Sequence, residues 1–263
     1  MVVGGISIVG GGNMGGALAR GLIGAGLPAA DLTIVEIDAS KHTALTSLFP
    51  GATITSTIGS CKNAVIAVKP ADAASATREA VGRGATTVLS IAAGVTLAKL
   101  AAAAGPGVAV IRAMPNTPAL VGEGASAFAL GPDCGPAAGE FAATVLGSVG
   151  LAVQVEEDLL DAVTGLTGSG PAYLFYVAEA LIAGGVAEGL DPTTAESLVR
   201  QLFLGAGTLL ARSSESPSRL RENVTSPNGT TAAGLAALSQ AGGREAFLAA
   251  VRAATARSIE LGQ

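Results

Sequence analysis

The chain is poor in the side chains on which most protein chemistry depends. Its 263 residues include one histidine, two cysteines and no tryptophan, and aromatic residues make up 3% of the total. The two cysteines, Cys61 and Cys134, are too few and too far apart for a disulfide framework, which favours a reduced, cytoplasmic protein. No group of Cys, His, Asp and Glu residues has the spacing of metal ligands, so we expect no metal.

Basic runs and long hydrophobic runs are missing as well. The formal net charge is −5, and without a basic run we expect no nucleic acid partner. No apolar run reaches the ~18 residues of a membrane span without Gly, Pro or polar breaks, and the N-terminus lacks the basic region of a signal peptide. We therefore expect no membrane partner, and the length suggests two domains.

The most informative stretch that is present lies near the start of the chain, from Ile6 to Gly26. A β-rich run is followed by Gly10, Gly12 and Gly15 in G-x-G-x-x-G spacing, and then by an apolar period of nearly four residues. This pattern predicts a strand, a tight turn and a helix whose N-terminus holds a pyrophosphate. Because 37 of the 263 residues are glycine, roughly 0.7 such matches are expected by chance, so a glycine-rich turn without a ligand is the alternative.

The sequence that follows favours the dinucleotide site. A second β-rich run, Leu32 to Ile37, brings Glu36 and Asp38 about 20 residues beyond the glycines, where an acid binds the cofactor ribose. A third run, Ala64 to Val68, ends at Lys69, which would face the ligand crevice at the carboxyl end of a parallel strand. A surface lysine before a turn is the other interpretation of Lys69.

Further β-rich runs alternate with helical periods as far as residue 155. This alternation predicts a doubly wound, mostly parallel α/β sheet of the Rossmann type. The run from Val88 to Ile91 leads to Ala92 and Ala93, small residues against which a nicotinamide ring could lie. The run from Val108 to Met114 leads to the rigid loop Pro115 to Pro118. Each of these loops could also be an ordinary turn.

From Glu156 onward the chain contains only helical periods, separated by breaks such as Gly165 to Pro171. We place the domain boundary so that residues 1–157 form the dinucleotide-binding Rossmann domain and residues 158–263 form an all-helical domain. The helical domain would bind substrate and dimerise, because Ala- and Gly-rich helices such as Ala178 to Gly185 suit close packing between subunits.

One hydroxyl-rich stretch of the helical domain, Asn223 to Leu235, differs from an ordinary helix surface. Threonine, serine and asparagine crowd around Pro227 and Gly229, directly before a helix that is predicted to start near Thr230. Hydroxyls together with the free N–H groups of a helix N-terminus would bind a small carboxylate. A helix cap without a ligand is the alternative.

The scarcity of acid–base groups restricts the reaction. The single histidine, His42, follows the second predicted strand on the adenosine side, where it cannot serve as catalytic acid. Oxidation of an alcohol needs a strong base, whereas a protonated imine needs mainly hydride, orientation and a weak proton source. Reduction of a C=N bond therefore fits this chain better.

Six stretches together resemble the pyrroline-5-carboxylate reductase family, in the family's order along nearly the whole chain. They are IVGGGNMGGALARGL, AVKP, SIAAGV, RAMPNTPALVGEG, EEDLLDAVTGLTGSGPAY and ENVTSPNGTTAAGL. The resemblance implies reduction of 1-pyrroline-5-carboxylate to L-proline by NADPH or NADH, the last step of proline biosynthesis. It also implies a Rossmann domain and an all-helical domain that interlocks in a homodimer, assembled into a larger homo-oligomer such as a decamer.

The resemblance also implies roles for individual residues. The cofactor would be bound by Gly10, Gly12, Asn13 and Met14 at the pyrophosphate, by Lys69 and Pro70 beside it, and by Ala92, Ala93, Met114 and Asn116 at the nicotinamide. The substrate carboxylate would be bound by Ser226, Gly229, Thr230 and Thr231. The hydroxyl of Thr231 would be the catalytic proton relay, and both subunits would complete the substrate site.

One position departs from the family pattern. Many members have Ser, Thr or Arg after the second strand to bind the 2′-phosphate of NADPH, whereas this chain has Glu36 and Asp38. A carboxylate would accept the 2′-hydroxyl of NADH and repel a phosphate. Glu36 is therefore expected to favour NADH or dual use, while Ser40 and Lys41 leave NADPH open.

Two other functions fit parts of the sequence. A related two-domain dehydrogenase for hydroxy acids should have a lysine or histidine base at the start of its helical domain, and Asp161 to Tyr173 contains neither. A dinucleotide sensor or scaffold without catalysis would have no use for the hydroxyl-rich loop from Thr225 to Thr231. Titration with cofactor would separate these functions, because a sensor binds it without turnover.

Overall fold

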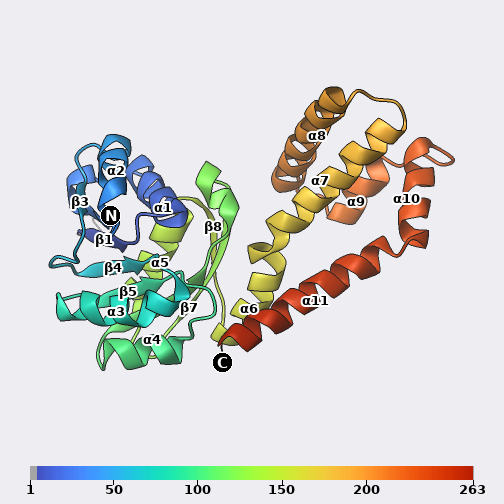
Figure 1. Ribbon diagram of the computed structural model, residues 1–263. Helices are drawn as coiled ribbons and strands as arrows, with labels where there is room; N and C mark the ends of the chain where they lie inside the picture. Colours follow the sequence, from blue (N-terminus) through green and yellow to red (C-terminus); the bar gives the residue numbers. More distant parts are fainter. Residues whose placement is uncertain (1–4, 263) are drawn as a thin grey trace. The chain divides into compact units, whose positions relative to one another are not determined.

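The computed structural model describes residues 5–262, and the eight strands within them form one sheet (Figure 1). The strands are β1 (Ile6–Val9), β2 (Leu32–Val35), β3 (Thr53–Thr55), β4 (Asn63–Ile66), β5 (Thr87–Ser90), β6 (Ala109–Met114), β7 (Gly124–Leu130) and β8 (Gly150–Gln154). Their order is β3-β2-β1-β4-β5-β6-β7-β8, and β6 and β7 form the one antiparallel pair. The predicted doubly wound, mostly parallel sheet is confirmed.

Helices cover both faces of this sheet, which explains why its central strands are short, mostly apolar and buried runs. One face packs on α1 (Asn13–Gly24), α2 (His42–Leu48) and α5 (Pro136–Gly147). The opposite face packs on α3 (Ala73–Gly82) and α4 (Leu97–Ala104). Apolar residues of β1 alternate between these two hydrophobic clusters, as the two-residue period of a strand requires.

The described residues form two compact units. One consists of residues 5–169 and 252–262, and the other of residues 170–251. The second unit is helical, and the helices that begin in it are α7 (Gly170–Ala187), α8 (Pro192–Arg212), α9 (Pro217–Asn223), α10 (Thr230–Gln240) and α11 (Gly243–Gly262). The end of α11 belongs to the first unit. The division into residues 1–157 and 158–263 stays a prediction.

Asp191 and Ser216 begin helices as their Asp-Pro and Ser-Pro sequences suggest. The Asp191 carboxylate accepts a hydrogen bond from the N–H of Thr194, and the Ser216 hydroxyl accepts one from the N–H of Arg219. Each is an N-cap followed by proline in the first turn.

The glycine-rich stretch from Gly165 to Pro171 is not the expected break between helices. Helix α6 (Leu160–Val163) continues into a π-helical turn, η6 (Thr164–Gly168). The two threonine hydroxyls of this turn donate to carbonyl oxygens four residues earlier, at 2.8 and 3.2 Å. A wide helical turn with its own side-chain hydrogen bonds thus occupies most of the predicted break, which is reduced to a bend at Ser169.

The helical region exposes many large apolar side chains. They include Phe175, Tyr176, Leu202 and Leu204, each more than half exposed in the single chain. One stretch, Glu157–Ala187, is long and apolar enough to cross a membrane by length and composition alone, and none of its most apolar window is buried. An exposed apolar surface of this size is normally buried against something else, and a second protein copy can bury it as well as lipid can.

Candidate active site

The glycine-rich segment between β1 and α1 forms a tight turn. Gly10 has φ +114°, and a Cβ at this position would overlap the Ala67 carbonyl oxygen. A Cβ on Gly15 would overlap the Gly10 carbonyl oxygen, so helix and strand approach more closely than other residues permit. Gly12 precedes the helix and has no atom within 4 Å of a Cβ position. Open space thus remains at the helix N-terminus, where a phosphate binds.

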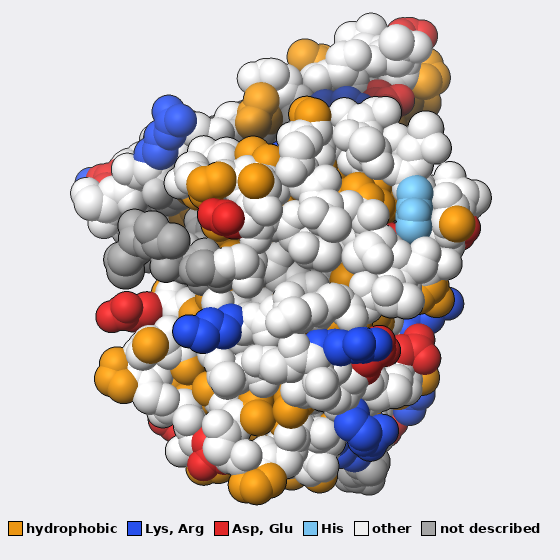
Figure 2. Space-filling view, turned by 90° about the vertical axis from the view of Figure 1, so that its left-hand side faces the viewer, with side chains coloured by type: hydrophobic (Ala, Val, Ile, Leu, Met, Phe, Trp, Pro, Cys, Tyr) orange, Lys and Arg blue, Asp and Glu red, His pale blue; other side chains and the backbone are white. Residues whose placement is uncertain are grey.

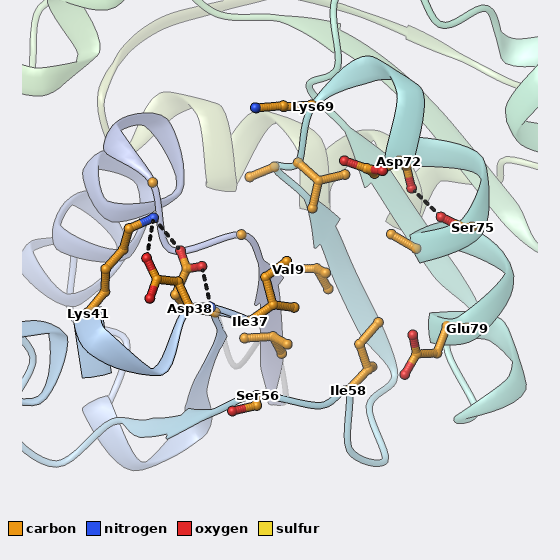
Figure 3. A pocket seen from close by; sticks show the side chains of 17 residues that line it. Val9, Ile37, Asp38, Lys41, Ser56, Ile58, Lys69, Asp72, Ser75 and Glu79 are labelled. Carbon is orange, nitrogen blue, oxygen red and sulfur yellow. Dashed lines mark hydrogen bonds and ion pairs between the residues drawn. The ribbon is translucent and has the colours of Figure 1, made fainter. Parts of the chain in front are cut away.

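A cavity of about 570 Å³ opens beside this turn (Figure 3). Its walls come from the carboxyl ends of β1, β2 and β4 and from α3. Figure 3 shows Lys41 and Asp38 on one side of the cavity and Asp72, Ser75 and Glu79 on the other. A cavity of this size at the carboxyl ends of parallel strands suits part of a dinucleotide.

Glu36 is the most firmly held polar residue of this cavity. Its N–H donates to the carbonyl of Thr55 at 2.9 Å, and its own carbonyl accepts from Nε2 of His42 at 2.7 Å. Its Oε1 accepts the N–H of Asp38 at 3.0 Å, and its Oε2 lies 3.6 Å from Nζ of Lys41. With 9% of its side chain exposed, Glu36 is a fixed carboxylate in the cavity wall.

Asp38 stands next to Glu36 and is fully charged at neutral pH. The hydroxyl of Ser40 donates to Asp38 Oδ1 at 2.6 Å, and the N–H of Ser40 donates to the same oxygen at 3.1 Å. These hydrogen bonds, helped by Lys41, hold the pKa of Asp38 below its ordinary value. Lys41 Nζ lies 3.7 Å from Asp38, so the ammonium group is shared between two acids.

The other residues predicted to bind the cofactor differ in how exposed they are and in which cavity they line. Asn13 is exposed and Met14 half-buried at the start of α1. Lys69 is exposed and lines the same cavity as Glu36, while Pro70 and Ala93 line a neighbouring one. The side chain of Ala92 is buried in the core, so only its backbone could contact the cofactor.

The side chains of Met114 and Asn116 are engaged within the protein. The amide of Asn116 donates from Nδ2 to the carbonyl of Thr167 at 3.0 Å, and its Oδ1 accepts the N–H of Ala125 at 2.9 Å. The methyl group of Met114 lies 2.9 Å from the position of a Cβ on Gly168. These contacts tie the end of β6 to the π-helical turn η6.

An ion-pair cluster lies next to these residues and was not among the site residues predicted from the sequence. Arg112 on β6, with a side chain 7% exposed, lies 3.1 Å from Glu157 Oε1 and 3.4 Å from Asp161 Oδ1. The hydroxyl of Ser258 also donates to Asp161 Oδ1, at 2.6 Å. The sequence feature that could have indicated this cluster is the single arginine within the apolar run Val108 to Met114, because a buried charge requires partners of opposite charge.

In the helical unit, the hydroxyl-rich loop leads directly into α10. Asn228 has φ 60° and Gly229 caps the helix, with its N–H donating to the carbonyl of Ser226 at 3.1 Å. A Cβ on Gly229 would overlap the Ser226 hydroxyl oxygen. Ser226, Thr230 and Thr231 are exposed, and no side chain caps the helix. The first N–H groups of α10 are therefore open to an anion.

Other kinds of chemistry find little support. Among residues 5–262 no group of three or more His, Cys, Asp and Glu side chains could hold a metal ion. Figure 2 shows one face on which Lys and Arg side chains are separated by acidic and uncharged ones. Burial raises the pKa of the Cys61 and Cys134 thiols, which leaves them poor nucleophiles.

Comparison with known proteins identifies the family. The family model for pyrroline-5-carboxylate reductase dimerisation matches residues 157–261, and the model for NADP oxidoreductase, coenzyme F420-dependent, matches residues 5–94. A pyrroline-5-carboxylate reductase of Arabidopsis thaliana is 37% identical, over 98% of this chain and 95% of its own length. The chain belongs to the pyrroline-5-carboxylate reductase family.

Solved structures of pyrroline-5-carboxylate reductases share the whole fold. The enzyme from Coxiella burnetii, 31% identical, superposes over 100% of both chains with a TM-score of 0.94. The enzyme from Plasmodium falciparum, solved with NADP bound, is 28% identical and superposes over 100% of both chains with a TM-score of 0.86. The family and the fold inferred from the sequence are thus confirmed, and the chain is an NAD(P)H-dependent oxidoreductase.

Proposed function

We propose how the residues of this pyrroline-5-carboxylate reductase divide the work of reducing the C=N bond of 1-pyrroline-5-carboxylate to L-proline. The observation that carries the proposal is the N-terminus of α10, which no side chain caps, with the exposed hydroxyls of Ser226, Thr230 and Thr231 around it. This is a carboxylate site without any group strong enough to ionise an alcohol. The reaction it suits is therefore hydride addition to an imine acid.

The cofactor site extends along the carboxyl ends of the parallel strands. Gly10, Gly12, Asn13 and Met14 surround the pyrophosphate at the N-terminus of α1, since Gly12 leaves open space there. The fixed carboxylate of Glu36 accepts a ribose hydroxyl in the cavity. The rest of the cofactor, up to its nicotinamide end, is bordered by Lys69, Pro70, Ala92, Ala93, Met114 and Asn116.

Within this last set, Asn116 offers its backbone, because its side-chain amide is bonded to Thr167 and Ala125. When bound, NADH or NADPH supplies the hydride that the imine carbon accepts. The residues present fit such a dinucleotide, because the turn, the open space at Gly12 and the carboxylate of Glu36 occur together.

The loop before α10 binds the substrate and supplies the proton. The N–H groups after Gly229 and the hydroxyls of Ser226 and Thr230 hold the carboxylate of the pyrroline ring. As hydride reaches the imine carbon, the electron pair of the C=N bond moves to the ring nitrogen. The Thr231 hydroxyl delivers a proton to this nitrogen and regains one from water, which makes Thr231 the catalytic residue.

Assembly and location complete the proposal. The match to the family's dimerisation domain and the exposed apolar side chains of α7 and α8 support a homodimer. We propose that both subunits complete the substrate site, that dimers join into a larger homo-oligomer such as a decamer, and that the enzyme is cytoplasmic. We also propose a functional boundary near residue 157, which the start of the dimerisation match supports.

Two substitutions in the loop test these roles. Ser226→Ala removes one hydroxyl from the carboxylate site and should raise the KM for the pyrroline by about tenfold, the equivalent of ~1.4 kcal/mol. Thr231→Ala should lower kcat by at least ~100-fold, while Thr231→Ser keeps the hydroxyl and most of the rate. Wild-type kcat and KM in Thr231→Ala would remove Thr231 from the mechanism.

A further inference from the structure

Three alternate residues of β6 and its extension contact the segment that leads to the helical unit. Arg112, Met114 and Asn116 occupy positions i, i+2 and i+4, which lie on one face of an extended chain. We name this set the β6 row. Its ion pairs and side-chain hydrogen bonds fall within residues 157–168, apart from the bond between Asn116 and Ala125, and the methyl group of Met114 faces Gly168.

Arg112 forms the charged end of the β6 row. Its guanidinium bonds to Glu157 at 3.1 Å and to Asp161 at 3.4 Å from two different nitrogens. Glu157 Oε1 also accepts the N–H of Leu97, at 2.6 Å, in the first turn of α4. Two carboxylates on a planar, buried guanidinium fix the direction in which this segment leaves the sheet.

Met114 and Asn116 form the other end of the row, against η6. The methyl group of Met114 packs on Gly168, so closely that any larger residue at 168 would displace it. The amide of Asn116 binds the carbonyl of Thr167 and thereby holds the π-helical turn. Turns of this kind are rare in helices and occur frequently at functional sites.

The returning chain is fixed to the same cluster. Ser258 on α11 donates to the Asp161 oxygen that faces Arg112. Residues 170–251, which contain the substrate loop, are joined to the rest of the chain through residue 169 and residue 252. Both connections are therefore bonded to one cluster centred on β6.

We infer that the β6 row is a set of positioning residues for the reductase reaction. It holds the chain segments that lead into and out of residues 170–251, the residues that carry Ser226 to Thr231, and the side chains of Arg112 and Asn116 do so through bonds within the protein. This inference rests on the role proposed for that loop. Since small errors in placement cost much rate, loosening the row should lower kcat, and loosening it at Arg112 should do so while leaving cofactor affinity intact.

Two variants loosen the row at different ends. Asn116→Asp keeps an acceptor for the N–H of Ala125 and loses the donor to Thr167. Arg112→Lys keeps the charge but loses the fork that bonds two carboxylates. The matched control, Asp133→Ala, removes a 3.2 Å hydrogen bond to Gly107, just before the opposite end of β6.

The readouts are kcat and KM for the pyrroline, measured well below the unfolding temperature, and the Kd of the free enzyme for NADH. Both variants should lose at least ~10-fold in kcat. Arg112→Lys should keep the Kd for NADH within about twofold, because Arg112 lines neither the cavity around Glu36 nor the nicotinamide end. Asp133→Ala should match the wild type. Unchanged kcat in folded variants would overturn the inference, and so would a Kd of Arg112→Lys for NADH that rises in step with its loss of kcat.

If either variant fails to fold, Gly168→Ala provides a milder test. Its Cβ presses only on the flexible end of Met114, so kcat should still fall by about threefold. A wild-type kcat in Gly168→Ala would then contradict the positioning role of the β6 row. Failure of the proposed function itself would appear earlier, as absence of turnover in the wild-type enzyme.

Discussion

Ser258 and Asp161, 97 residues apart in sequence, are joined by a 2.6 Å hydrogen bond between hydroxyl and carboxylate. The same carboxylate oxygen lies 3.4 Å from Nη2 of the buried Arg112. The end of α11 is thus fastened to the start of the helical segment and to β6 by one charged group. Hydrogen bonds to charged, partly buried groups are among the stronger ones in proteins.

Ser258→Ala should therefore reduce the free energy of unfolding by ~1.5–3 kcal/mol, because Asp161 loses one of its hydrogen-bond donors. Denaturant unfolding measures this change. The control Ser47→Ala removes an exposed helix hydroxyl that bonds only to Thr43 on α2, and should stay within about 0.5 kcal/mol of the wild type. Equal stabilities for both variants would mean that the Ser258 bond contributes nothing.

Glu36 should control the choice between NADH and NADPH. Glu36→Gln keeps the shape of the side chain but removes the charge that repels a 2′-phosphate, and it frees Lys41 from one of its two acids. The ratio of kcat/KM for NADPH to that for NADH should rise by about tenfold. The same ratio should change much less in Glu79→Gln, which removes a charge from the opposite side of the cavity.

Lys41→Gln should act in the opposite direction, lowering kcat/KM for NADPH and leaving that for NADH nearly unchanged. If NADPH is already strongly preferred by the wild type, the interpretation of Glu36 as a discriminating carboxylate is wrong.

Asp38 should remain charged throughout the range of an enzyme assay. Hydrogen bonds from Ser40 lower its pKa below the ordinary value of 3.8, so their contribution to stability is present above that value and is lost as the pH falls through the lowered pKa. Cofactor preference should not vary with Asp38 between ~pH 6 and ~pH 8. Titration of the Asp38 carboxyl by NMR checks this, and Ser40→Ala should move its pKa upward.

The two cysteines should be less reactive in the folded protein than in the unfolded chain. Burial raises the pKa of both thiols, so the native state favours the protonated form. The associated stability is present below the ordinary thiol pKa of about 8.5 and is lost as the pH rises through the raised value. Alkylation at ~pH 8.5 should be slower in the native protein than in denaturant, with Cys61→Ser separating the two sites. Equal rates would contradict the burial.

The fold could be predicted because its signals are local. The central strands are short, mostly apolar runs, and Gly10 and Gly15 stand where only glycine fits, as the φ of +114° at Gly10 also shows. The acid at Glu36 is placed by its distance from the glycine turn. Three helix starts, at Pro192, Pro217 and Thr230, also follow from neighbouring residues.

Features that depend on distant contacts could not be predicted. Arg112 meets its acids 45 and 49 residues later, and nothing near it in the sequence identifies them. The π-helical turn looks like a glycine-rich break until Asn116 and Met114 are packed against it. The end of α11 joins the first unit through Ser258 and other long-range contacts, so the sequence pattern alone places it with the helices.

The most direct test of the central claim is NADH and NADPH oxidation by the purified enzyme with 1-pyrroline-5-carboxylate, with the product identified. The account predicts rapid turnover to L-proline, with kcat/KM for NADH equal to or above that for NADPH. Cofactor binding without any turnover of the pyrroline would contradict it and would favour a dinucleotide sensor.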